Sequence, residues 1–244
     1  MLILLPPSET KRPDGVGVSI DKAAIIWASL EPARKKLYEA LAELGKDPDS
    51  AAKALGLGKK NMAELEYNRN LLSAPTMPAL RRYTGVLYDA LDFDSLDQLA
   101  IERADRQLFI QSALFGLLPA MQGIPPYRLS AGSKLPGISL KSLWREAHAE
   151  VWPRLVGPVL DMRSKAYVDL NPVPDNRDTK FVEVVDEGGK ALNHFNKKAK
   201  GAFVRSALLN SLEGFEDIGR VAHQAGLSAE LADDLVFLKV PQGF

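Results

Sequence analysis

The sequence contains no cysteine, and its positive and negative charges cancel. Without cysteine there are no disulfide bonds, thiolate nucleophiles or cysteine-ligated metals, a composition typical of proteins from a reducing cytoplasm. Lysine and arginine together number 31, as do aspartate and glutamate, so attraction to a polyanion would require a local cluster of basic residues. We therefore expect a cytoplasmic protein whose charge is organised locally.

Long apolar runs are also missing. The start, MLILLPPSETK, has a four-residue apolar run and no preceding basic region, so it does not predict a signal peptide. The longest uncharged stretch, 107–127, is interrupted by glycine and proline, which argues against a membrane span. A hydrophobic content of 46% with 25% charged residues predicts one globular domain over 1–244.

Histidine is scarce as well. The three histidines, His148, His194 and His223, are scattered and show no paired spacing with a carboxylate. Direct iron binding is therefore not expected, and the sequence predicts neither a metal site nor another cofactor.

What the sequence does contain is an apolar segment, 107–137, around which we expect the protein to be organised. Residues 108–112 predict a buried strand and 113–118 a short helix or turn; a Gly- and Pro-rich loop with Tyr127 and Arg128 follows. Such a loop is typical of a binding site, although Arg128 could instead pair with a carboxylate. Because residues 129–133 supply no acid, we expect Arg128 to grip a ligand in an open cationic cleft. Its replacement by Ala should then leave stability unchanged or slightly raised.

Polar residues follow two other predicted strands. Residues 2–5 predict a buried central strand and 157–160 a second one, and the carboxyl edge of such strands is where open α/β sheets place ligands. The residues concerned are Ser8, Glu9 and Lys11 after the first strand and Asp161, Arg163, Ser164 and Tyr167 after the second.

The remaining pattern predicts an α/β fold, a mixed sheet with surrounding helices and a helical subdomain at about 46–104. Amphipathic periodicity predicts helices over 31–44, 78–90, 95–103 and 139–152. Residues 181–187 and 191–195 predict a hairpin around two glycines, and 234–240 a final strand.

Residues 50–65 contain two helical patterns joined by Gly56-Leu57-Gly58. This pattern resembles a helix-hairpin-helix, which grips nucleic-acid phosphates through hairpin amides and nearby lysines, and it is equally typical of a structural connector. The candidate DNA-binding residues are Lys53, Gly56, Gly58, Lys59 and Lys60.

Residues 188–212 contain no acid and several bases. On a helix beginning near Asn196, one side would carry Lys198, Gly201 and Arg205, and Gly201 would let a phosphate approach the backbone. The alternative is a solvated face of a surface helix. The candidates here are Lys197, Lys198, Lys200, Gly201 and Arg205.

Residues 218–237 have the pattern of a helix-turn-helix. Its would-be recognition helix, 228–235, holds three acids and no base, so we do not expect it to read DNA.

Five stretches together resemble one family: MLILLPPSETKR, RRYTGVLYDALD, IQSALFGLLPAMQGIPPYRLSAGSKLPG, VLDMRSKAYVDL and NHFNKKAKGAFVRSALL. The chain resembles the YaaA peroxide-stress protein family over nearly its whole length. The resemblance implies a cytoplasmic protein that is induced by hydrogen peroxide, lowers free iron and binds DNA. It also implies a mixed α/β fold around a cationic cleft with a helix-hairpin-helix.

Two functions therefore compete. One is a non-enzymatic stress protein that binds double-stranded DNA weakly and without strong sequence preference. The other is an enzyme or binder of an anionic, nucleotide-like small molecule, with Glu9, Tyr127, Asp161 and Tyr167 as acid–base candidates. Both require that cleft residues converge, and we expect this of Ser8, Lys11, Arg128, Arg163 and Lys198.

Overall fold

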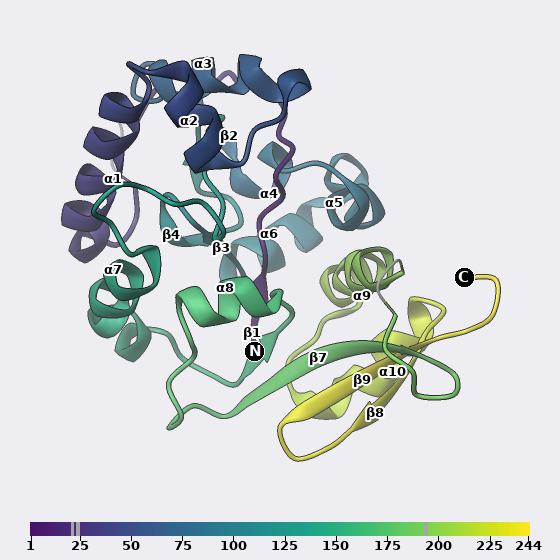
Figure 1. Ribbon diagram of the computed structural model, residues 1–244. Helices are drawn as coiled ribbons and strands as arrows, with labels where there is room; N and C mark the ends of the chain where they lie inside the picture. Colours follow the sequence, from purple (N-terminus) through teal and green to yellow (C-terminus); the bar gives the residue numbers. More distant parts are fainter. Residues whose placement is uncertain (21, 23–24, 193–194) are drawn as a thin grey trace.

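The computed structural model describes residues 1–20, 22, 25–192 and 195–244 (Figure 1). Within them, seven strands form one mixed sheet in the order β4-β3-β1-β6-β7-β9-β8. Their bounds are β1 (Leu2–Leu5), β3 (Leu108–Ser112), β4 (Gly116–Pro119), β6 (Val159–Asp161), β7 (Thr179–Asp186), β8 (Ser228–Leu231) and β9 (Leu235–Val240). The α/β fold class is confirmed.

The central strand is β1, whose four residues are all buried. It pairs in parallel with β3 on one side and β6 on the other, while β4 and β8 form antiparallel edges. A strand buried on both faces needs a continuous apolar run, which is why Leu2–Leu5 could be predicted. The strands predicted over 108–112 and 234–240 are also confirmed, and 113–118 forms a turn followed by most of β4.

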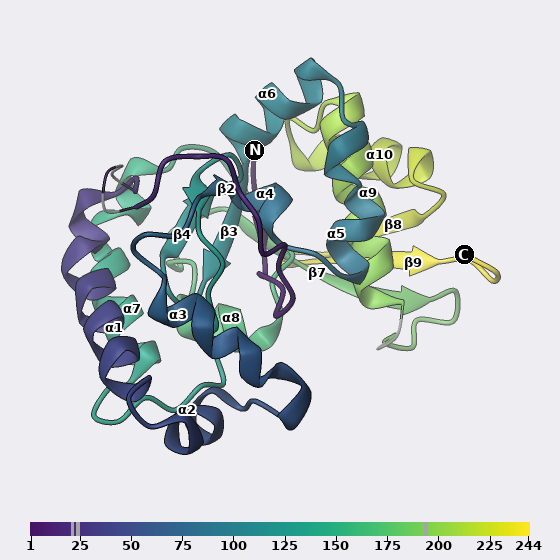
Figure 2. The same cartoon turned by 90° about the horizontal axis from the view of Figure 1, so that it is seen from above.

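The α-helices surround this sheet, and a short two-stranded sheet joins two of the loops. The helices are α1 (Glu31–Leu44), α2 (Pro48–Leu55), α3 (Leu65–Arg69), α4 (Ala79–Arg82), α5 (Val86–Leu91), α6 (Gln98–Gln107), α7 (Leu140–Ala147), α8 (Lys165–Leu170), α9 (Asn196–Asn210) and α10 (Ile218–Gln224). The short strands are β2 (Met77–Pro78) and β5 (Gly123–Ile124). Seen from above, α5, α6, α9 and α10 lie together beside β7–β9, whereas α1, α2, α3 and α7 lie around the β3–β4 end (Figure 2).

Some helix boundaries differ from the predictions. The helix predicted over 78–90 is two helices, α4 and α5, because Tyr83 is extended and bridges to Lys11, and Gly85 has a φ of 97°. The helix predicted over 139–152 ends at Ala147 and continues as 3-10 turns. Among the described residues, no helix has both the length and the apolarity needed to cross a bilayer.

Three other expectations change. The helix-hairpin-helix is not confirmed, because after Gly58 the chain forms a 3-10 helix, Lys59–Glu64, before α3. The would-be recognition helix of the C-terminal segment is a strand, β8, in agreement with its rejection as a DNA reader. Beyond β7, Ala191 forms only an isolated bridge to Val185; His194, in the second half of the predicted hairpin, lies outside the described residues.

Candidate functional site

The connections of the sheet reverse direction at β1. The chain passes from β1 to its neighbour β3 and later returns to β6 on the other side of β1. In open α/β sheets, such a switch point opens a crevice at the carboxyl ends of the strands, where ligands bind. The segments that leave these ends carry Lys11 after β1, Tyr127 beyond β3 and Arg163 after β6.

The Lys11 side chain folds back over its own loop. Its Nζ donates to the carbonyl oxygens of Ser8 at 3.0 Å and Glu9 at 3.1 Å, and it lies 4.2 Å from the centre of the Tyr127 ring. Burial lowers the pKa of Lys11 to about 7, and the positive charge of Arg128 adds to this effect.

Under Lys11 lies a buried chain of three hydroxyl groups. Ser112 Oγ accepts the N–H groups of Leu114 and Phe115, so its own hydroxyl donates to Tyr127 Oη at 2.8 Å. Tyr127 Oη lies 2.8 Å from Tyr83 Oη, to which it donates in turn. Burial raises the pKa of both tyrosines, so they act as neutral hydrogen-bonding groups at physiological pH and not as bases. The sequence did not single out Tyr83 or Ser112, because only the fold brings them to Tyr127.

Arg128 is buried and paired with two carboxylates. Its Nη2 lies 3.0 Å from Glu9 Oε2, and its Nη1 lies 3.2 Å from Glu64 Oε2. The Asn68 side chain accepts a hydrogen bond from the backbone N–H of Arg128 and donates one to its carbonyl oxygen. The expectation of an open cationic cleft around Arg128 is therefore wrong, because Glu64, 64 residues away in sequence, supplies the acid that the neighbouring residues lack.

Asp161 and Arg163 also form a buried ion pair. Asp161 Oδ1 accepts from the N–H and Nε of Arg163, and Oδ2 lies 2.6 Å from Nη2. Arg163 Nη1 donates to the carbonyl oxygen of Asn171 at 2.8 Å. The pair is neutral as a unit, so Arg163 adds no net charge to the site, and the Asp161 carboxylate is occupied by structural contacts.

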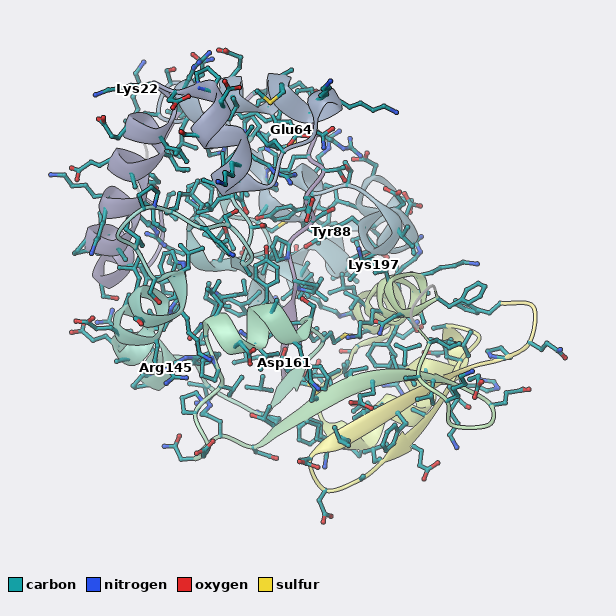
Figure 3. All side chains as sticks on the ribbon, in the orientation of Figure 1. Lys22, Glu64, Tyr88, Arg145, Asp161 and Lys197 are labelled. Atoms are coloured by element: carbon teal, nitrogen blue, oxygen red, sulfur yellow. The ribbon has the colours of Figure 1, made fainter. Side chains whose placement is uncertain are left out.

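Next to this ion pair is a cavity of about 520 Å³. It lies between β7 and the first residues of α8 and α9, and Figure 3 labels Asp161 at the end of β6 and Lys197 at the start of α9. The polar and charged residues that line it are Arg163, Ser164, Lys165, Glu183, Asn196, Lys197 and Lys200. Lys200 Nζ donates to the carbonyl oxygen of Met162 at 3.0 Å, and burial lowers the pKa of Lys200 to about 8. Because Asp161 neutralises Arg163, the remaining charged residues of the lining are three lysines, Lys165, Lys197 and Lys200, and one acid, Glu183.

The rest of α9 has a structural role. Gly201 is buried against α5, where an added Cβ would lie 2.1 Å from the carbonyl oxygen of Leu87. The prediction that a phosphate approaches Gly201 is therefore wrong, because another helix occupies that space. Arg205 donates to the carbonyl oxygens of Leu91 and Asp92 at the end of α5. Lys198 lies 4.7 Å from the centre of the Phe244 ring and does not line the cavity.

Comparison with known proteins shows the family of this chain. The family model described as Peroxide stress protein YaaA matches residues 1–230. A UPF0246 protein of Corynebacterium glutamicum (strain R) is 42% identical over 238 residues, which cover 94% of this chain and 95% of the relative. The chain belongs to the YaaA peroxide stress protein family. A UPF0246 protein of Streptomyces coelicolor is 42% identical over 215 residues (85% and 83% of the two chains), and an uncharacterized protein of Campylobacter jejuni is 27% identical over 222 residues (89% of each).

In this YaaA-family chain, the predicted site residues form two groups. Lys11, Glu9, Arg128 and Tyr127 lie together, and the Tyr167 hydroxyl accepts the N–H of Ala131 in the loop after Arg128. Ser164, Lys197 and Lys200 line the cavity with Arg163. Ser8 contributes its carbonyl to Lys11, and its hydroxyl lies 3.2 Å from that of Thr10.

The lysines predicted to contact DNA lie elsewhere on this YaaA-family protein. Lys53, Lys59 and Lys60 are exposed around the turn after α2, where Gly56 has a φ of 66°. The exposed Lys134 joins them, because its N–H donates to the carbonyl oxygen of Ala54. We call Lys53, Lys59, Lys60 and Lys134 the α2 lysine patch. Within the part of the chain that the structure describes, none of the four forms an ion pair.

Within the described residues, no group of three or more His, Cys, Asp or Glu side chains is arranged so that it could hold a metal ion. His148 has a structural role: its Nε2 accepts the N–H of Leu117 at 3.0 Å, and its Nδ1 donates to the carbonyl oxygen of Trp144 at 2.7 Å. Burial lowers the pKa of His148 to about 4, so this ring is neutral at physiological pH.

Proposed function

We propose that this YaaA-family chain acts in the peroxide-stress response by binding double-stranded DNA through backbone phosphates. The observation that carries the proposal is the α2 lysine patch: four exposed lysines, which form no ion pair with the described residues, lie on α2, on the 3-10 helix after it and on the loop bonded to Ala54, in a chain with no net charge. Lysines of this kind contact phosphates without reading bases, so binding would be weak and tolerant of sequence.

The resemblance to the family also implies protection against free iron. Because the described residues hold no cluster of metal-ligating side chains, an effect of this chain on free iron would be indirect. The protein would limit iron-dependent damage by covering the DNA, and it would not need to bind the metal itself.

The DNA proposal is tested by fluorescence anisotropy with duplexes of unrelated sequence over a range of salt concentrations. We expect the double variant Lys59→Ala, Lys60→Ala to bind all sequences more weakly. The slope of log affinity against log salt concentration should decrease in magnitude by about 2, because binding displaces about one counterion for each phosphate contact and the variant makes two contacts fewer. The control is Lys35→Ala, Lys36→Ala, an exposed pair on α1. Native binding that is absent at low salt, or indifferent to salt, contradicts the proposal.

We propose as a second candidate that the cavity binds an anionic, nucleotide-like small molecule. The observation that favours it is the combination of size and charge: a space of about 520 Å³ in which Lys165, Lys197 and Lys200 outnumber Glu183. Small-molecule sites commonly have a volume of about 300–1,000 Å³ and a few fixed polar groups. The position beside the switch point supports the same candidate.

Calorimetric titration with adenosine triphosphate and with inorganic pyrophosphate tests this second candidate. We expect Lys197→Ala to weaken binding about tenfold, because it removes one charge-assisted contact worth about 1.5 kcal/mol. Lys36→Ala is the control and should bind like the parent. Equal affinity of the Lys197→Ala and parent proteins, or no heat from either anion, would exclude the cavity as the site.

A further inference from the structure

The amine of Lys11 has a geometry that neither proposed function requires. A neutral lysine amine has two N–H bonds and one lone pair, whereas an ammonium has three N–H bonds. Two backbone acceptors are in place, the carbonyl oxygens of Ser8 and Glu9 at 3.0 and 3.1 Å, and Nζ also lies 4.2 Å from the centre of the Tyr127 ring. The neutral amine can therefore satisfy both of its N–H groups and keep a lone pair outside the hydrogen bonds.

The charged groups that face Lys11 come from four segments. Arg128, beyond β5, and Arg82, on α4, disfavour the ammonium, whereas Glu64 and Glu9 favour it. Glu9 and Glu64 stabilise the ammonium less than free carboxylates would, because both are paired with the Arg128 guanidinium. Nζ lies over the Tyr127 and Tyr83 rings, whose faces attract an ammonium, while burial removes water from the amine. Burial is the largest effect, and the pKa of Lys11 is lowered to about 7.

A desolvated lysine beside another cation is how proteins activate an amine for attack on a carbonyl group. We infer that Lys11 is the nucleophilic amine of a site that forms an imine with an aldehyde. The lone pair of Nζ attacks the carbonyl carbon, a C–N bond forms, and the C=O π electrons move to oxygen. Both amine hydrogens then leave with that oxygen as water, which gives C=N without oxidation or reduction.

The aldehyde could belong to a small metabolite or to the opened sugar of an abasic site in DNA, and these share the same reacting group. The α2 lysine patch makes the second source possible, and in that form the inference rests on the proposed DNA function. The small-aldehyde form does not, so the two can fail separately.

The test uses the full chain with cyanoborohydride as the trapping reductant. One arm contains glyoxylate and the other a duplex with a single abasic site, and peptide mapping by mass spectrometry locates the adduct. At about pH 7 we expect Lys11 to be modified at least about tenfold faster than the exposed Lys36, because about half of the Lys11 amine is neutral at this pH. Modification by glyoxylate alone assigns a small aldehyde, and modification by the duplex assigns the DNA sugar.

A second test measures the pH dependence of Lys11 modification in the native protein, so misfolding of a variant cannot affect its result. The rate of Lys11 modification should rise with pH and reach half of its maximum near pH 7. Lys11→Arg should lose the adduct, and Lys36→Arg should keep it, with thermal unfolding used to check that both are folded. The inference is overturned if Lys11 reacts no faster than Lys36 in both arms, or if the rate of Lys11 modification shows no midpoint near pH 7.

Discussion

Asp161→Ala is expected to reduce the free energy of unfolding by about 3–5 kcal/mol, the usual cost of removing one partner from a buried ion pair. The side chains of Arg163 and Asp161 are 0% and 3% exposed, so neither is stabilised by water. Without Asp161, the guanidinium would keep the carbonyl oxygens of Tyr167 and Asn171 as acceptors, and among the described residues no carboxylate would pair with its buried charge. Urea unfolding of the variant beside the parent measures the loss.

Two further variants make this test specific. Glu43→Ala removes the acid of an exposed ion pair with Lys46 and should change stability by less than about 1 kcal/mol. The double variant Asp161→Leu, Arg163→Met replaces both charges with apolar groups and should be more stable than Asp161→Ala alone. A single variant as stable as the parent would show that the pair does not hold the end of β6.

Arg128→Ala should also be destabilising, by about 3 kcal/mol, the lower end of the range for a buried pair. The Arg128 side chain is 6% exposed, but Glu9 is 68% and Glu64 22% exposed, so water can partly solvate the carboxylates that are left behind. Without the Arg128 charge, Glu9 and Glu64 would also favour the ammonium form of Lys11, which would compensate part of their charge. This expectation reverses the one drawn from the sequence, which was unchanged or slightly raised stability.

Thermal and urea unfolding of Arg128→Ala, together with DNA and nucleotide titrations, separate the two interpretations. Arg69→Ala is the matched control, because Arg69 pairs with Glu66 at the surface and its loss should be nearly neutral. An unchanged unfolding midpoint with lost affinity would restore Arg128 as a ligand-gripping residue. A lowered midpoint with unchanged affinity would establish it as a scaffold for the Lys11 loop.

These ion pairs change how the charge of the site should be understood. Arg128 and Arg163 are the conspicuous bases of the loops at the switch point, yet both are neutralised by acids in the folded protein. The positive charge available to a ligand lies instead on lysines, in the α2 lysine patch and around the cavity. A lysine ammonium is a point charge on a flexible chain, which suits phosphates held without strict geometry.

The sequence by itself determined the parts of the fold that depend on local pattern. The apolar run Leu2–Leu5 specified a buried strand, and the 3.6-residue periodicity specified α1 over Glu31–Leu44. It also placed Lys11, Arg128 and Arg163 in segments that leave the strands, because such segments follow apolar runs directly. Family membership, too, was readable from the sequence, since the matching stretches cover nearly the whole chain.

Tertiary structure alone decided what those residues contact. Glu64 reaches Arg128 across 64 residues, Tyr83 meets Tyr127 across 44, and the carbonyl oxygen of Leu87 fills the space beside Gly201. Charge counts along the chain could not reveal these contacts, because an ion pair or a helix packing depends on distances in space that local patterns do not encode. For the same reason the sequence could name the basic residues of the site, and only the fold could show which of them remain available to a ligand.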